Sequence, residues 1–199
     1  SDINSANQGF QNQFRFSKAI GNYKVKGAEI VINRKSESFS AWVSYVLSEN
    51  NYEFEDLVPS TFPNNLDMQH AATLAGSYSW NALKLALGVN WHSGKPYTIP
   101  LAGAETTTEG SLTTVQYDMP NSQRLPDYLR ADFSAEYLWK LSPTFDAKIN
   151  IALLNLLNTK NTVNIRYALV RDDTNEVTVN KVEELSLGIA PNFSIQLMF

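Results

Sequence analysis

The sequence singles out few candidates for acid–base or metal chemistry. They are the two histidines, His70 and His92, and the carboxylates Asp132 and Glu136, which lie on one strand. Neither histidine has a second ligand at a metal-binding spacing, so we expect no zinc site. Asp132 and Glu136 share one face of a strand, but the four-residue step separates them by about 13 Å. That distance is too long even for the carboxylate pair of an inverting glycosidase.

Motifs for other reactions are also missing from the sequence. It contains no Gly-x-Ser-x-Gly segment and no phosphate-binding loop. We therefore expect no enzymatic activity and no cofactor, and a serine–histidine pair formed across strands is the one enzymatic alternative. His70 lies in the segment Asp67–His70, and we expect it to make a structural hydrogen bond rather than to act in catalysis.

The composition excludes several classes of protein. The net charge is −4, and the sequence has no basic stripe that could contact the phosphates of a nucleic acid, so we expect no nucleic-acid partner. Without cysteine, the fold contains no disulfide and no thiolate metal site. No apolar run is long enough for a transmembrane helix. The first residues, Ser1–Asn4, have neither a basic start nor an apolar run, so we expect no signal peptide there.

Apolar and polar side chains alternate with a period of two along several stretches, which places them on opposite faces of strands. The clearest stretch has Phe39, Ala41, Val43, Tyr45 and Leu47 at its odd positions, opposite mostly serines. No window has a comparable helical repeat. The pattern predicts an all-β, antiparallel fold of about eight strands. These strands are expected near residues 10–19, 22–35, 38–50, 69–80, 82–97, 127–139, 144–157 and 187–199.

A soluble β-sandwich would also alternate in this way, but three features favour strands that cross a membrane. Several runs exceed the length of about 5–6 residues that is usual in soluble proteins. Short and long connections alternate back to residue 35, as in transmembrane barrels, and only the short turn expected at Gly21–Asn22 departs from this order. Aromatic residues gather beside the short turns, as in an interfacial girdle. They are Tyr78, Trp80, Tyr137, Trp139 and Phe145.

Several segments resemble TonB-dependent outer-membrane receptors, particularly those of Bacteroidetes-type bacteria. The segments Gly94–Thr98 and Arg124–Asp132 are similar to that family's Gly-x-Pro-Tyr-Thr and Arg-Leu-Pro-x-Tyr-x-Arg-x-Asp stretches. Asn155–Asn161 resembles its Asn-Leu-Phe-Asn-x-x-Asn segment, with Leu157 in place of Phe. Further matches are Gly27–Glu29, Asp67–His70 and the C-terminal assembly signal, whose residues here are Phe193, Ile195, Leu197 and Phe199.

The resemblance implies a barrel of about 22 strands in the bacterial outer membrane, filled by an N-terminal plug and energised through TonB. Residues 1–199 would be the C-terminal part of that barrel, with the plug and earlier strands lying outside them. The expected function is uptake of a large extracellular nutrient of the glycan, siderophore or cobalamin class. In the glycan branch a surface lipoprotein would cap the barrel. The alternative is a complete small barrel of eight strands, acting as a structural protein or porin.

The two faces and the loops then have different expected partners. The apolar face would contact lipid, and the polar face would line a hydrated wall. The polar-face residues are Glu29, Asn33, Lys84, Asn90, Asp132, Glu136, Lys148 and Asn150. Ligand binding is expected in the long extracellular loops, about 51–66, 99–124 and 158–186. Tyr52, Phe54, Phe62 and Tyr117 are the candidate ligand contacts, or alternatively pack the loops together. A hairpin is expected from 163–170 and 176–182.

Overall fold

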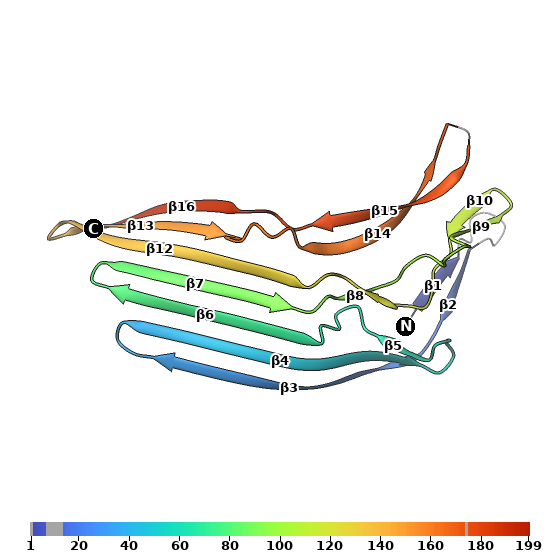
Figure 1. Ribbon diagram of the computed structural model, residues 1–199, viewed down its shortest axis with the longest axis horizontal. Coiled ribbons are helices and arrows are strands. Elements are labelled where there is room, and N and C mark those ends of the chain that lie inside the picture. Colours follow the sequence, from blue (N-terminus) through green and yellow to red (C-terminus); the bar gives the residue numbers. More distant parts are fainter. Residues whose placement is uncertain (1, 7–13, 174) are drawn as a thin grey trace.

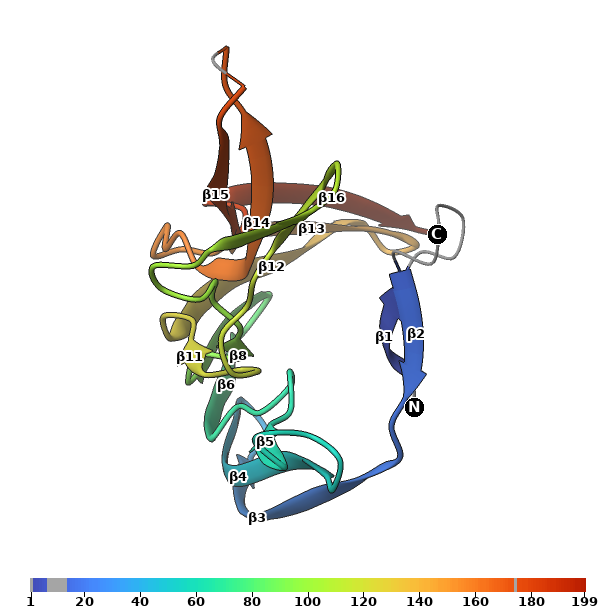
Figure 2. The same ribbon diagram turned by 90° about the vertical axis from the view of Figure 1, so that its right-hand side faces the viewer.

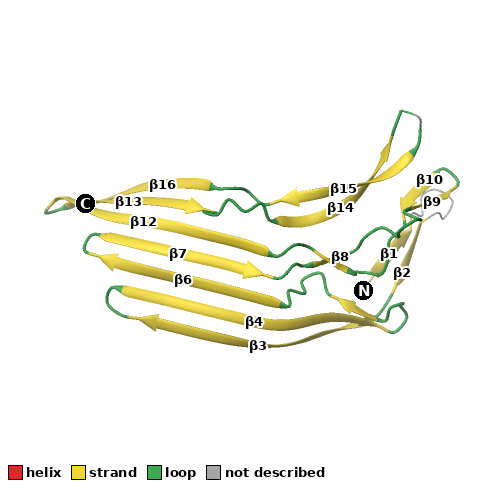
Figure 3. Cartoon of the chain, in the orientation of Figure 1, coloured by secondary structure: helices red, strands yellow, loops and turns green. Residues whose placement is uncertain are grey.

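The computed structural model describes residues 2–6, 14–173 and 175–199, and every regular element within them is a β-strand. The main element is one long antiparallel sheet with the strand order β16-β13-β12-β7-β6-β4-β3, to which β5 is added beside β4 (Figure 1). Figure 3 shows the same sheet coloured by secondary structure. The bounds are β3 (Gly21–Lys35), β4 (Phe39–Phe54), β5 (Thr61–Pro63), β6 (His70–Trp80), β7 (Leu83–His92), β12 (Tyr128–Ser142), β13 (Phe145–Leu154) and β16 (Ala190–Met198).

Short turns lie at one end of the long sheet and long connections at the other (Figure 1). The turns β3–β4, β6–β7 and β12–β13 use only two or three residues each, which confirms the predicted alternation from residue 35 onwards. In the β6–β7 turn Asn81 has a φ of 52°, a left-handed conformation that asparagine tolerates better than most other non-glycine residues.

The long connections contain strands of their own. One joins β8 (Pro96–Tyr97) to β11 (Gln123–Arg124), with β9 (Thr106–Glu109) and β10 (Leu112–Val115) between them. The predicted hairpin is confirmed as β14 (Thr162–Arg171) and β15 (Val177–Leu185). The predicted loop 51–66 was too long, because β4 continues to Phe54 and pairs with β5.

The first predicted strand, 10–19, is confirmed in its described part. Residues 10–13 lie outside the described part, and 14–18 form β2 (Phe14–Lys18), which pairs with β1 (Asp2–Ala6) rather than with β3. The turn expected at Gly21–Asn22 is absent. Gly21 instead starts β3 and pairs with Phe54 at the far end of β4. The unforeseen extension of β4 therefore gives the start of β3 a strand partner.

The long sheet curves into an open trough (Figure 2), and among the residues that the structure describes no second sheet covers its apolar side. Within the described residues the buried hydrophobic side chains are only Ala19, Phe54, Leu125, Ala131 and Ala147. A sandwich of this size would bury large side chains between two sheets, and the described residues contain no such core. β3 and β16 form the two edges, and no pairing in the described part closes them into a barrel. No helix in that part is long and apolar enough to span a membrane.

Candidate functional site

One face of the long sheet is apolar and exposed from edge to edge. The strand register aligns Phe39, Tyr78, Leu85, Ala135, Ile151 and Phe193 in a single row across six strands. A second row runs through Ile32, Val43, Leu74, Val89 and Ala131. Many large members of this apolar face are 40–65% exposed, including Val43 at 40% and Trp80 at 65%, and others, such as Leu85, Val89 and Phe133, are half-buried. Paired residues project to the same side of a sheet, so the apolar face is continuous.

Charged side chains are distributed unequally between the two faces. The apolar face of strands β4, β6, β7, β12, β13 and β16 carries no Asp, Glu, Lys or Arg among the described residues. This holds from the short turns as far as the row of paired residues that contains Leu47. At the edge, Arg34 of β3 shares that face, close to the short-turn end. The eight residues predicted for the polar face all lie opposite the apolar face, as the register requires.

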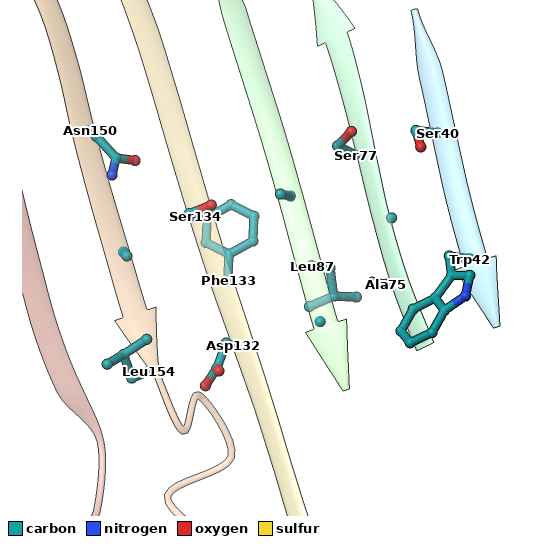
Figure 4. Close-up of a pocket in the computed structure, with 14 residues that line it drawn as sticks. Ser40, Trp42, Ala75, Ser77, Leu87, Asp132, Phe133, Ser134, Asn150 and Leu154 are labelled. Carbon is teal, nitrogen blue, oxygen red and sulfur yellow. The ribbon is translucent and has the colours of Figure 1, made fainter. Parts of the chain in front are cut away.

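The polar face carries a hollow of about 530 Å³ (Figure 4). Its base consists of small residues, because Ser40, Ser77, Ala86, Ser134 and Ala152 form one row across five strands. In Figure 4 the indole of Trp42 lies toward one side of this hollow, and Asp132 and Asn150 lie toward the other. The arrangement leaves space above the small side chains for another molecule or domain to approach the sheet.

Polar side chains on this face are paired with one another. Lys148 Nζ lies 3.5 Å from Glu136 Oε1 on the neighbouring strand. Ser44 Oγ donates to Glu29 Oε1 at 3.3 Å. Asp132 Oδ1 accepts hydrogen bonds from Arg130 Nε at 2.7 Å and from the backbone amide of Asn155 at 2.8 Å. Asp132 is thereby fixed as a structural acceptor where strand β12 begins.

At the long-loop end, half-buried Arg124 forms an ion pair with buried Asp67 that joins the connection before β6 to the connection between β7 and β12. Asp67 is 1% exposed, and one of its carboxylate oxygens accepts from Arg124 Nη2. The other accepts from the Asn50 amide at 2.7 Å. Arg124 Nη1 donates to the Asp67 and Gly94 carbonyls at 2.8 and 3.0 Å. We call Asp67, Gly94 and Arg124 the rim clasp.

Gly94 of the rim clasp cannot be replaced by a residue that has a Cβ atom. A Cβ atom at this position would lie 1.6 Å from the Leu125 carbonyl oxygen. The close approach lets the Leu125 amide donate to the Lys95 carbonyl at 2.9 Å, beside the short β8–β11 pair. Glycine is required because the two backbones meet there.

Two buried asparagines hold the next connection. Asn161 Oδ1 accepts from the Leu129 amide at 2.8 Å, and its Nδ2 donates to the Leu129 carbonyl at 2.9 Å. The side-chain amide of Asn161 therefore makes the two hydrogen bonds to the backbone of Leu129 that a residue of a neighbouring strand would make. Asn155, with a φ of 52°, donates through Nδ2 to the Thr159 and Leu187 carbonyls, both at 2.9 Å. Both asparagines are 3% exposed.

Three of the four predicted loop aromatics lie together. The rings of Tyr52, Phe54 and Phe62 have centroids 5.8–6.0 Å apart, and Tyr23 lies 5.8 Å from Tyr52. Phe54, the last residue of β4, is buried at 7% exposure and stacks on Phe62, so these rings pack β5 and its loop onto β4. Tyr117 lies apart from the cluster, half exposed and in a bridge to Pro100. Ligand contact by these aromatics stays a prediction.

The two histidines have structural partners. His70 Nδ1 lies 2.8 Å from the Tyr45 hydroxyl, which confirms the expected hydrogen bond. His92 Nδ1 lies 2.9 Å from the Ser93 carbonyl, and its ring stacks on Tyr128 at 4.8 Å. Within the described part, no group of three His, Cys, Asp or Glu side chains could hold a metal ion.

The residues predicted as the C-terminal assembly signal share the apolar side of the edge strand. Phe193, Ile195 and Leu197 project from β16 with exposures of 55–61%, and Phe199 follows it fully exposed. Their role in assembly stays a prediction.

Sequence reasoning missed the roles of Asp67, Arg124, Asn155 and Asn161. Each of the four lies in a segment that resembles a receptor segment, but the spacing of residues in the sequence does not identify its hydrogen-bond partners. A usable signal was present: these polar residues occur at strand ends, where alternation stops. No protein-family model and no curated protein matches this chain.

Proposed function

We propose that this chain forms part of the wall of an outer-membrane β-barrel receptor that takes up a large nutrient with energy from TonB. The observation that carries the proposal is the continuous apolar face, exposed and free of charge across six strands, opposite a polar face. Such a face is more stable in contact with lipid than with water, because in water several hundred Å² of apolar surface would stay exposed to the solvent.

The height of the apolar face fits a bilayer. From Leu129 to Trp139 on β12 the apolar-face side chains are all uncharged. This stretch is about 33 Å long at about 3.3 Å per residue, which gives a height of about 25 Å at a strand tilt of about 40°. Transmembrane barrels have an apolar band about 25 Å tall, with aromatic girdles at its borders. Phe39, Tyr78, Trp80, Tyr137 and Trp139 lie at the short-turn border, where a periplasmic girdle would be.

The unpaired edges support a barrel larger than the strands present here. β3 and β16 each expose a row of backbone groups, and in lipid such groups must be hydrogen-bonded. Additional strands from the same polypeptide would satisfy them and close the barrel. The hollow on the polar face would then lie inside, where its small side chains leave room for a plug domain.

The receptor function rests on the long-loop end. The rim clasp and the buried asparagines hold the loops in fixed positions, as a binding surface requires. Exposed Tyr117 is a candidate for contact with the nutrient there, and glycans, iron chelates and cobalamins all remain candidate ligands. A surface lipoprotein is the expected partner if the ligand is a glycan.

Spin labels on neighbouring residues of β7 test the membrane topology, because the chain has no cysteine of its own. Leu87→Cys and Val89→Cys would place labels on the apolar face, and Ala86→Cys and Gly88→Cys on the polar face. In lipid vesicles, the first pair should be more accessible to oxygen and the second to a water-soluble nickel complex. Equal exposure of all four labels to the nickel complex would refute a membrane wall.

A complete small barrel makes a different prediction. Residues 1–199 alone would then close into a barrel in detergent, and the migration of that barrel on a gel would change on heating. We expect no such heat-dependent change for residues 1–199 alone. The receptor role is tested by deleting the gene and measuring growth on glycans, iron chelates and cobalamins as limiting nutrients. Loss of growth on one of them that also depends on TonB is expected, and unchanged growth on all would refute uptake.

A further inference from the structure

The part of β3 and β4 that extends beyond β6 carries a cluster of aromatic rings on the polar side of the sheet. Tyr23 of β3 pairs with Tyr52 of β4, and Tyr52 projects to the same side as Ser40 because both hold even positions of one regular strand. β5 places Phe62 opposite Tyr52. In a barrel whose polar face lies inside, this cluster faces the mouth at the long-loop end.

The cluster is buried at one end and exposed at the other. Phe54 is 7% exposed, whereas Tyr23 is 54% exposed. The ring of Tyr52 lies between them, with its centroid 5.8 Å from that of Tyr23 and 6.0 Å from that of Phe54. A Cβ atom at Gly21 would clash with the Phe54 ring, so glycine lets this ring pack against the backbone of β3. The exposed ring therefore rests on packed rings, and a fixed ring lowers the entropy that is lost when a ligand binds.

An amide side chain lies beside the exposed ring. The Tyr23 hydroxyl donates to Asn50 Oδ1 at 3.2 Å. The backbone of Asn50 is held on both sides, because its amide donates to Asp67 Oδ1 at 2.7 Å and its carbonyl accepts from the Asn64 amide at 2.9 Å. Among the described residues, Asn50 Nδ2 donates to no acceptor. Its N–H groups are therefore available to a ligand that contacts the Tyr23 ring.

The charged residues of this extension lie on the opposite face of the two strands. They form two exposed ion pairs, Lys24 with Glu53 and Lys26 with Glu49. On the face that carries Tyr23, the positions of β3 and β4 beyond the pair Gly27–Ser48 include no charged residue. An anionic ligand would therefore meet no cation on this face of the strands, and a cationic ligand would meet no carboxylate.

We propose that Tyr23 and Asn50 bind one ring of a neutral saccharide at the mouth of the receptor, which selects glycans among the three nutrient classes. This site rests on the receptor function proposed above. The tyrosine ring covers the C–H face of the sugar, and the Asn50 amide donates to its hydroxyl groups. An anionic iron chelate lacks a cation here. One exposed ring matches one sugar ring in size, whereas the corrin of a cobalamin spans several.

Calorimetric titration of the detergent-solubilised receptor that contains this chain tests the site. The probes are neutral oligosaccharides from starch, cellulose, xylan, mannan and fructan, a ferric tricatecholate and cyanocobalamin. We expect one class of oligosaccharide to bind and the iron chelate and cobalamin to give no signal. Tyr23→Ala should weaken saccharide binding about tenfold, because the ring contact is lost. Tyr23→Phe keeps the ring and should weaken it less than about threefold.

Tyr137→Ala is the matched control, because Tyr137 is 48% exposed but lies on the apolar face near the short turns. It should leave the affinity unchanged. The saccharide site is overturned if the iron chelate or cobalamin binds instead, if no probe binds, or if Tyr23→Ala binds saccharide as tightly as the unmodified receptor. The receptor function is judged separately, by TonB-dependent growth. A gene deletion that abolishes growth on an iron chelate or a cobalamin alone would support the receptor and overturn this site.

Discussion

The two ends of the long sheet are held together by different interactions. At the short-turn end, each pair of strands is closed by two or three residues, and exposed aromatic side chains flank the turns. At the long-loop end, buried polar groups join segments that are far apart in the sequence, such as Asp67 and Arg124. The first end depends on local backbone geometry and the second on a few long-range polar contacts. Single substitutions should therefore have larger effects at the long-loop end.

Removal of Arg124 should have the largest effect. Arg124→Ala leaves the carboxylate of Asp67 buried without its cation, which costs about 3–5 kcal/mol. Hydrogen exchange should increase in residues 55–69 and 93–127 while the β12–β13 turn stays protected. The control is Arg166→Ala, which breaks the exposed pair with Glu184 and should cost under about 1 kcal/mol. Similar exchange in both variants would mean that the rim clasp does not hold the loops.

Asn161→Ala should have the next largest effect. It leaves the amide and the carbonyl of Leu129 without their side-chain partners, at about 1–3 kcal/mol for each group that stays buried. Limited proteolysis within residues 155–189 should become faster. Asn164→Ala, on the exposed β14 surface, serves as the control and should leave cleavage unchanged.

The smallest effect should come from the short-turn end. Asn81→Ala places alanine at a φ of 52°, which costs about 1 kcal/mol. Asn81→Gly should be neutral, because glycine adopts that conformation without strain. Chemical denaturation of the three proteins in detergent gives the comparison. A loss with Asn81→Ala as large as with Arg124→Ala would contradict the proposed difference between the two ends.

The elements predicted well from sequence are those that depend on local pattern. Alternation located β3, β4, β6, β7, β12, β13 and β16 and the faces of their side chains, because a period of two is visible within a few residues. The turn predicted at Gly21–Asn22 failed because alternation does not identify the partner of a strand, and β2 pairs with β1. The rim clasp could not be foreseen, since Arg124 and Asp67 are 57 residues apart and no local rule connects them.

The order of strands also has a consequence for how the chain folds. Each hairpin with a short turn, β3–β4, β6–β7 and β12–β13, pairs segments that are adjacent in the sequence, so its loop closes at a low cost in entropy. The rim clasp must wait until Arg124 has been brought back to Asp67 and Gly94. We therefore expect the hairpins to form early and the loops at the other end to become ordered last.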